Sequence, residues 1–264
     1  MGEGDMNILP LQKGILYGPI DSRRLGRSLG INLMPTTYKA CSFNCVYCHY
    51  GNTDVLTDDL AKCAQDLPAP IDVVAAVEGA LASDVKFDYL TFSGNGEPTL
   101  YPDFETIVRR IAALRDKKQP ALKIALLSNS SAAHRENVKR ALRFIDLPVF
   151  KLDAGNAAMF SKTNRPCPEV QFSDIVQSLS TLENIYLQTV VMYGEPANAD
   201  AQELTSYYGV VARIKPREVQ IYSLDRPVPN AKIRRVPPRD VEKIAARGAR
   251  ETGVPFRAYY LEGT

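Results

Sequence analysis

Residues 41–51 read CSFNCVYCHYG, which places Cys41, Cys45 and Cys48 within one short loop. Closely spaced thiolates can converge on a metal without a large loss of chain entropy. Three thiols are one ligand fewer than a closed tetrahedral zinc site needs, so the spacing favours an iron–sulfur cluster with one iron left open. A zinc site completed by His49, or thiols that bind no metal, are the alternatives that the spacing leaves open.

A second motif follows about forty-five residues later, where residues 89–100 read YLTFSGNGEPTL. The apolar start predicts a strand, and the glycines predict a loop whose backbone can approach a ligand closely. Taken alone, GNGEP is also compatible with an ordinary turn between a strand and a helix.

Composition predicts an ordinary globular protein of one domain. The chain has 264 residues, of which 45% are hydrophobic and 23% charged, and its net charge of +2 indicates no bias toward nucleic acid or membrane. No apolar run is long enough to cross a bilayer and the start of the chain does not resemble a signal peptide, so we expect a cytoplasmic protein. Five cysteines, three of them in one loop, favour metal chemistry over disulfides. We expect Cys63 and Cys167 to be unrelated thiols.

Short β-type runs alternate with helical stretches, which is typical of βα units around a parallel sheet. The predicted strands are Ser28–Leu33, Tyr89–Ser93, Leu122–Leu127, Val149–Leu152, Ile185–Met192, Glu218–Leu224 and Phe256–Leu261. The predicted helices are Ile71–Leu81, Pro102–Arg115, Arg135–Phe144, Ser173–Leu182, Ala201–Ile214 and Pro238–Thr252. About six such units predict an α/β fold that is an open, partial barrel, with its functional loops at the C-terminal ends of the strands. We expect residues 1–27 to form an N-terminal cap or hairpin and residues 28–264 to form the barrel domain.

Polar residues at predicted strand ends are further site candidates. Lys151 and Asp153 lie two residues apart on one face of a strand, where their opposite charges partly neutralise each other; a purely structural ion pair is the alternative. Arg165 lies in a short loop, and its guanidinium suits a carboxylate or phosphate, although a surface ion pair is the commoner use.

The combined motifs resemble those of the radical SAM superfamily, whose members cleave S-adenosylmethionine (SAM). The resemblance rests on CxxxCxxC, the aromatic Tyr47 just before the last cysteine, and GNGEP, in which Asn95 replaces a common glycine. It implies that Cys41, Cys45 and Cys48 ligate a [4Fe–4S] cluster whose fourth iron binds SAM, in a partial (β/α)6 TIM-like barrel of the radical SAM type. The residues that it implies for SAM binding are Tyr47, Gly94, Asn95, Gly96, Glu97, Pro98, Ser128, Asn129 and Asp153. Ser128 and Asn129 are also compatible with capping the following helix.

The resemblance also implies a reaction. The reduced cluster passes one electron to SAM, and the resulting 5′-deoxyadenosyl radical abstracts hydrogen from a substrate that the sequence does not identify. Lys151, Asp153 and Arg165 are the predicted catalytic residues, and an external one-electron donor such as ferredoxin or flavodoxin is implied.

Within the superfamily, GPIDSRRLGRSLGIN, KLDAGN and YSLDRP resemble compact proteins related to the wyosine-forming tRNA enzymes. Wyosine synthesis itself is not favoured, because the additional N-terminal cysteines and the flavodoxin-like domain of those enzymes are absent from this sequence. The alternatives are an activating enzyme that forms a glycyl radical on a partner protein, an RNA-modifying enzyme, and a metal-binding module without catalysis. The substrate is accordingly a small molecule, a protein or a tRNA.

Overall fold

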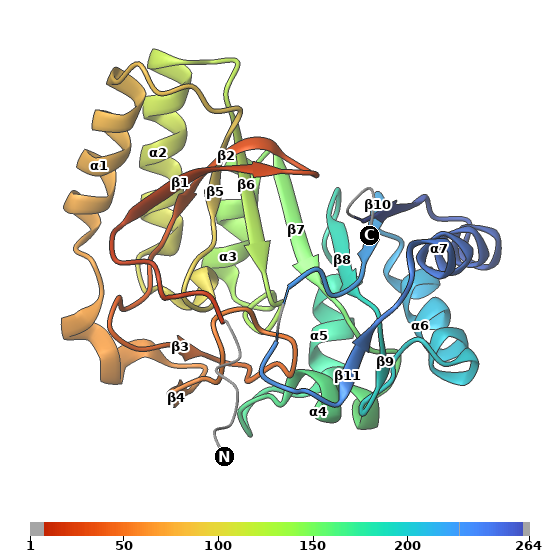
Figure 1. The fold of residues 1–264 in the computed structure, drawn as a ribbon. Helices are drawn as coiled ribbons and strands as arrows, with labels where there is room; N and C mark the ends of the chain where they lie inside the picture. Colours follow the sequence, from red (N-terminus) through yellow and green to blue (C-terminus); the bar gives the residue numbers. More distant parts are fainter. Residues whose placement is uncertain (1–7, 227, 261–264) are drawn as a thin grey trace. The chain divides into compact units, whose positions relative to one another are not determined.

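The computed structural model describes residues 8–226 and 228–260, which are drawn in Figure 1. They divide into two compact units. We call residues 11–42 and 54–150 the N-terminal unit. We call residues 8–10, 43–53 and the described residues from 151 onward the C-terminal unit. No helix among the described residues is both long and apolar enough to cross a membrane.

The N-terminal unit is built on a sheet that begins with a hairpin. Its strands are β1 (Leu16–Ser22), β2 (Gly26–Ile31), β5 (Tyr89–Phe92), β6 (Lys123–Ser128) and β7 (Leu147–Lys151), the last residue of which belongs to the C-terminal unit. Strand β1 pairs antiparallel with β2, and the pairs β2–β5, β5–β6 and β6–β7 are parallel. A separate short pair joins β3 (Ala40–Cys41) to β4 (Val55–Leu56) in parallel. Parallel pairing directs the ends of β5 and β6 to the same edge of the sheet.

Helices link these strands in βα order. They are η1 (Leu60–Asp66), α1 (Pro70–Ala82), η2 (Pro98–Leu100), α2 (Phe104–Lys118), α3 (Glu136–Ala141) and η3 (Leu142–Phe144). Helix α2 shows why the sequence folds this way, because Phe104, Ile107, Val108 and Ile111 are all fully buried and recur at helical spacing. Helices α1 and α2 lie side by side in Figure 1.

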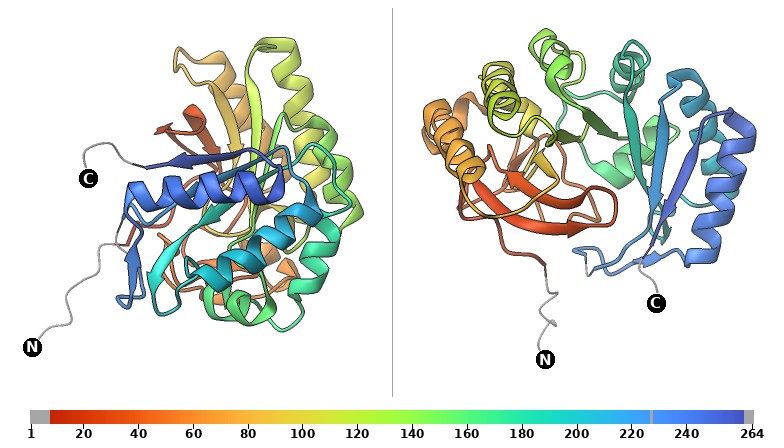
Figure 2. Two further views of the ribbon diagram at one scale, coloured as in Figure 1. Left: turned by 90° about the vertical axis from the view of Figure 1, so that its right-hand side faces the viewer. Right: turned by 90° about the horizontal axis from the view of Figure 1, so that it is seen from above.

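The C-terminal unit carries a parallel sheet of β8 (Tyr186–Val190), β10 (Glu218–Tyr222) and β12 (Phe256–Tyr259). A two-stranded antiparallel ribbon of β9 (Met192–Gly194) and β11 (Ile233–Arg235) follows β8 and β10. The helices are α4 (Ala157–Asn164), α5 (Phe172–Leu179), α6 (Ala201–Ile214) and α7 (Pro238–Thr252). Figure 2 shows α6 and α7 along the same face of the β8–β10–β12 sheet.

Close packing holds α7 against that sheet. A Cβ added to Gly248 would lie 2.6 Å from the Phe256 ring, so only glycine lets the helix approach the strand at this point. Tyr208 of α6 is also fully buried, and its hydroxyl donates to the Ile244 carbonyl oxygen at 2.9 Å. Side chains of α6 and β12 thus pack against α7 and fix the helical layer of this unit.

The predicted strands and helices are found with shifted ends. The predicted strand 185–192 ends as β8 at Val190, and Met192 begins the antiparallel ribbon. The predicted helix 173–182 ends at Leu179, where the Ser180 hydroxyl donates back to the Val176 carbonyl oxygen. Helix α4 is not predicted at all. Residues 1–7 of the predicted cap and Leu261 of the last predicted strand lie outside the described residues, and the domain boundaries stay a prediction.

Candidate functional site

The GNGEP loop follows β5 and is held tightly against the segment that leads into Cys41. Gly94 has a φ of +129°, in the region that favours glycine. A Cβ added to Gly96 would lie 1.9 Å from the Ala40 carbonyl oxygen, which is closer than any side chain permits. Glycine at position 96 therefore allows the loop to lie directly on β3, next to the first cysteine.

Asn95 fixes the same loop from the inside. It is fully buried, and its side-chain amide donates to the carbonyl oxygens of Gln12 and Pro35, each at 2.9 Å. Its side-chain oxygen accepts from the Gln12 backbone N–H at 2.8 Å. The side chain is thus engaged within the protein. Its backbone N–H donates to the Asn32 side-chain oxygen at 3.1 Å, and its predicted role in SAM binding stays a prediction.

Glu97 joins the GNGEP loop to the loop after β6. The carboxylate is 1% exposed and accepts from the Thr99 N–H at 3.0 Å, from the Thr99 hydroxyl, and from the backbone N–H of Asn129. Burial raises the pKa of Glu97, although these donors oppose the change. The Ser128 side chain also opposes the rise in the pKa of Glu97, so donors from both loops surround the carboxylate.

The loop after β6 also reaches the first cysteine. Asn129 donates from its side-chain amide to the Ser42 hydroxyl at 2.9 Å and to Cys41 Sγ at 3.5 Å. Ser128 does not cap a helix but accepts from the backbone N–H of Ser130, which has a φ of +79°. The structure thus brings Glu97, Asn129 and Cys41 together in the N-terminal unit.

In the C-terminal unit, the cysteine loop packs on the end of α4. The backbone N–H of Asn44 donates to the Asn164 carbonyl oxygen and that of Val46 to the Thr163 carbonyl oxygen, both at 3.0 Å. Val46 also belongs to an apolar cluster whose other buried members are Val190, Met192, Leu224, Val228 and Ile233. The loop that presents Cys45 and Cys48 is therefore anchored both by backbone hydrogen bonds and by burial.

Tyr47, Asp153 and Asn164 form one hydrogen-bonded group beside Cys45. The Tyr47 hydroxyl donates to the Asp153 carboxylate, and the Asn164 amide reaches the same carboxylate at 3.0 Å. Asp153 is further held by the backbone N–H of Val190 at 2.8 Å. The Asn164 amide also lies 3.5 Å from Cys45 Sγ. Burial, with the neighbouring Asp153 charge, holds the pKa of Tyr47 well above its usual value.

Lys151 extends this group toward β10. Its ammonium lies 3.0 Å from the Asp153 carboxylate and 3.4 Å from the Tyr222 hydroxyl, and it stands 4.9 Å from the centre of the Tyr47 ring. Burial alone would lower the pKa of Lys151, but the Asp153 charge and hydrogen bond, together with Tyr222 and Cys45, outweigh burial and raise the pKa. The predicted ion pair of Lys151 and Asp153 is thus present, with Asp153 two residues beyond the end of β7, and its catalytic role stays a prediction.

Arg165 lies apart from that pair. It ends α4 with a φ of +45° and is exposed, and it lines a cavity of about 580 Å³ with Met159, Lys162 and Glu203. Among the contacts of the described residues, none joins Arg165 to Lys151 or Asp153. Its predicted catalytic role stays a prediction.

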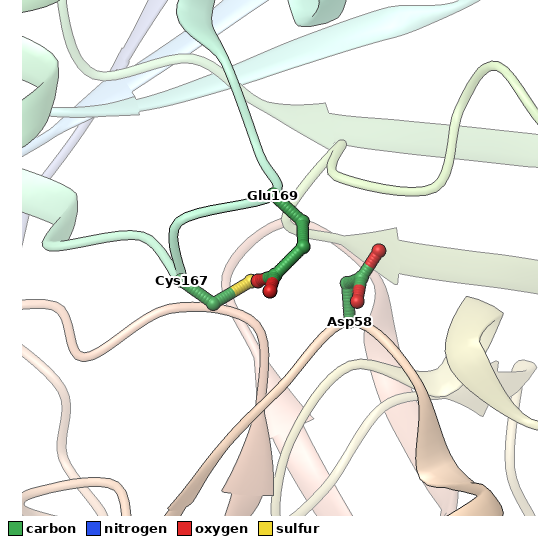
Figure 3. Close-up of side chains that lie close together, drawn as sticks. All are labelled: Asp58, Cys167 and Glu169. Atoms are coloured by element: carbon green, nitrogen blue, oxygen red, sulfur yellow. The ribbon is translucent and has the colours of Figure 1, made fainter.

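Cys63 and Cys167, like the three clustered cysteines, are thiols that form no disulfide. Cys167 is buried, and its sulfur lies within 4.8 Å of a carboxylate oxygen of Glu169, which is also drawn in Figure 3. Cys63 is buried in η1. The expectation that they are unrelated thiols stays a prediction.

Three polar residues are not predicted from the sequence, of which Asn164 and Gln188 are buried and Tyr222 is half-buried. The Gln188 side-chain oxygen accepts from the Tyr222 hydroxyl at 3.3 Å. Asn164 lies between Cys45 and Asp153, but only its position next to Arg165 in the run TNRP draws attention to it in the sequence. The side-chain oxygen of Asn164 and the side-chain nitrogen of Gln188 have no hydrogen-bond partner among the described residues.

Curated relatives cover much of this chain. It is 29% identical to a protein named GTPase Obg of Brachyspira hyodysenteriae over 86% of its own length and 32% of that protein. It is 31% identical to the UPF0026 protein slr1464 of Synechocystis, over 81% of its length and 77% of that protein. The chain thus spans only about a third of the first relative.

Solved structures show the fold. A radical SAM methyltransferase from Sphaerobacter thermophilus matches with a TM-score of 0.65 and 15% identity, over 89% of this chain and 67% of that one. A structure of TYW1 with a lysine-pyruvate adduct bound matches with a TM-score of 0.59 and 13% identity, over 86% and 75%. These matches confirm the predicted α/β fold, a partial TIM-like barrel of the radical SAM type.

The family comparison agrees with the motifs. The sequence model described as Radical SAM superfamily matches residues 36–203, a span that contains the cysteine loop, GNGEP and the Lys151–Asp153 pair. The resemblance inferred from these motifs is confirmed, and the chain belongs to the radical SAM superfamily.

Proposed function

We propose that this protein is an enzyme that binds a [4Fe–4S] cluster through Cys41, Cys45 and Cys48 and cleaves SAM reductively. The observation that carries the proposal is the donor set itself: three thiols in one loop, outside any disulfide, two of which accept a hydrogen bond from an asparagine amide. Amide donors suit sulfur ligands that carry negative charge, as cluster thiolates do. When bound, the cluster and SAM together supply one-electron cleavage chemistry that begins hydrogen abstraction from a substrate.

The residues of the chain have defined tasks in this proposal. Asp153 holds the Tyr47 hydroxyl and thereby fixes the ring next to the third cysteine of the loop. Lys151 balances the Asp153 charge, so the group next to Cys45 carries little net charge. The glycines of GNGEP offer a backbone edge to SAM, while Glu97 keeps that loop joined to Asn129.

The electron comes from an external donor such as ferredoxin or flavodoxin in this proposal. The substrate is a small molecule, a protein or a tRNA. The likeness to a methyltransferase and to TYW1 supports the fold on which this function rests, and carries no substrate with it.

Anaerobic reconstitution tests the proposal. The protein should bind about four iron and four sulfide ions per chain, as a [4Fe–4S] cluster requires. Dithionite with SAM should then yield 5′-deoxyadenosine and methionine. Cys45→Ala should lose both iron and SAM cleavage, and Cys63→Ala, a change of a buried thiol outside the loop, should lose neither. Zinc without sulfide, or full activity of the Cys45→Ala protein, would show that the proposal is wrong.

A further inference from the structure

Asn129 presents a fixed N–H donor to the thiol of Cys41. Its amide nitrogen lies 3.5 Å from Cys41 Sγ and 2.9 Å from the Ser42 hydroxyl. Its side-chain oxygen accepts from the backbone N–H of Ser131 at 3.0 Å. Because a backbone N–H can only donate, the oxygen must face Ser131 and the nitrogen must face the sulfur.

Asn164 presents an equivalent donor to Cys45. The residue is 2% exposed, and its amide nitrogen lies 3.5 Å from Cys45 Sγ, 3.0 Å from the Asp153 carboxylate and 3.1 Å from the Tyr47 hydroxyl. An ionised carboxylate can only accept, so Asp153 selects the amide nitrogen for this side. Helix α4 ends at Asn164, whose carbonyl oxygen is bonded to the cysteine loop, so its backbone is fixed as well.

We propose that Asn129 and Asn164 are positioning residues that raise the reduction potential of the cluster through N–H···S hydrogen bonds. This inference rests on the proposed function, because it requires Cys41 and Cys45 to be cluster ligands. Reduction adds one electron from the external donor and makes the ligand sulfurs more negative. A donor to sulfur stabilises the more negative state more, and hydrogen bonds to the sulfurs are among the factors that set cluster potentials.

Both donors are neutral amides, and this determines how they affect the reduction potential. They add no charge beside the thiols and do not titrate, so their contribution is independent of pH. They also act on different sulfurs and share no partner among the described contacts. The effects of removing them should therefore be additive.

A redox titration of the reconstituted full-length protein, followed by electron paramagnetic resonance of the reduced cluster, tests the inference. Asn129→Leu and Asn164→Leu remove the donor at similar volume. Each variant should lower the reduction potential of the cluster. At a fixed applied potential, the ratio of oxidised to reduced cluster should rise about tenfold, which corresponds to a shift of 59 mV for one electron. The double variant should shift by the sum. Asn164→Asp, which keeps the shape but adds a negative charge, should shift further than Asn164→Leu.

Asn156→Leu is the matched control. Asn156 caps the start of α4 through the backbone N–H of Met159 and bonds to Glu203, and no contact joins it to a cysteine among the described residues. It should weaken α4 and leave the potential unchanged.

The outcomes separate the two proposals. If the parent protein assembles no iron–sulfur cluster, the proposed function fails. If the parent assembles one and the Leu and Asp variants keep its potential, or shift no more than Asn156→Leu, the function stands and the inference is overturned. Loss of iron in both the Leu and the Asp variant at a position would also overturn it, because the amide would then be needed for assembly.

Discussion

Replacing Gly96 by alanine should disrupt the packing of the GNGEP loop on the segment that leads into the cysteines. The new Cβ would lie 1.9 Å from the Ala40 carbonyl oxygen, whereas real contacts keep at least 3.0 Å. The obstacle is the backbone of β3, which cannot rotate away as a flexible side chain would. Loop and strand must therefore separate by about 1 Å, and overpacking of this kind costs on the order of 1–3 kcal/mol. We expect the upper end of that range, because a backbone atom has to move.

The displacement begins one residue before Cys41, so the Gly96→Ala protein should also bind less iron. Urea unfolding followed by circular dichroism gives the free energy of unfolding, and iron per chain after reconstitution gives cluster loading. Gly79→Ala is the control, because a Cβ at that position in α1 meets nothing within 4 Å. It should stabilise the protein by about 0.5–1 kcal/mol, as alanine favours a helix interior over glycine. A Gly96→Ala protein as stable and as iron-loaded as the parent would refute the packing argument.

Two further predictions concern buried charges. Lys151→Met should reduce the free energy of unfolding by about 3–5 kcal/mol, because it leaves the fully buried Asp153 carboxylate without its counter-charge. The double variant, Lys151→Met with Asp153→Asn, should recover part of this loss. Both are measured in the same urea assay. In the N-terminal unit, burial alone would raise the pKa of Asp146, but the Ile124 N–H and the Arg115 guanidinium outweigh burial and lower it from 3.8. The ionised Asp146 carboxylate therefore stabilises the protein above about pH 4, and this contribution is lost as the pH falls through the lowered pKa of the folded protein. The difference in the free energy of unfolding between the parent and Asp146→Asn should accordingly shrink on acidification. A difference that stays constant between pH 7 and pH 3 would show that the ionised carboxylate contributes nothing.

Strands and most helices are predictable because their signal is local. The strand predicted at 89–93 is β5 (Tyr89–Phe92), and the strand predicted at 218–224 is β10 (Glu218–Tyr222), since apolar β-type residues and the loops that follow them are adjacent in the chain. Helix α4 lacks such a signal. It has only eight residues and ends at Asn164, and the following residue, Arg165, takes a left-handed conformation without being the glycine that would mark the end.

Some residues of the candidate site are likewise predictable from local sequence, and others are not. Cys41, Cys45 and Cys48 are recognisable together because a single loop supplies all three, and their spacing alone limits the metals that they suit. The pairing of Lys151 with Asp153 is also predictable, because the two opposite charges are only two residues apart in the chain; the strand itself ends at Lys151. Asn129 and Asn164 are different, because they reach the thiols of Cys41 and Cys45 from 88 and 119 positions away along the chain. Only the fold creates those contacts.

The chemistry of asparagine is a second reason why the contacts of Asn129 and Asn164 with sulfur are hard to predict from the sequence. A search for metal ligands or charged groups passes over asparagine, which rarely has either role. Yet a lysine or arginine at the same place would form an ion pair with the thiolate and oppose the binding of iron by charge repulsion. An amide donates a hydrogen bond to the sulfur without bringing a positive charge toward the metal. A neutral donor next to a sulfur ligand is thus compatible with both a loaded cluster and a tuned potential, and the direction of its N–H, available only from the structure, reveals it.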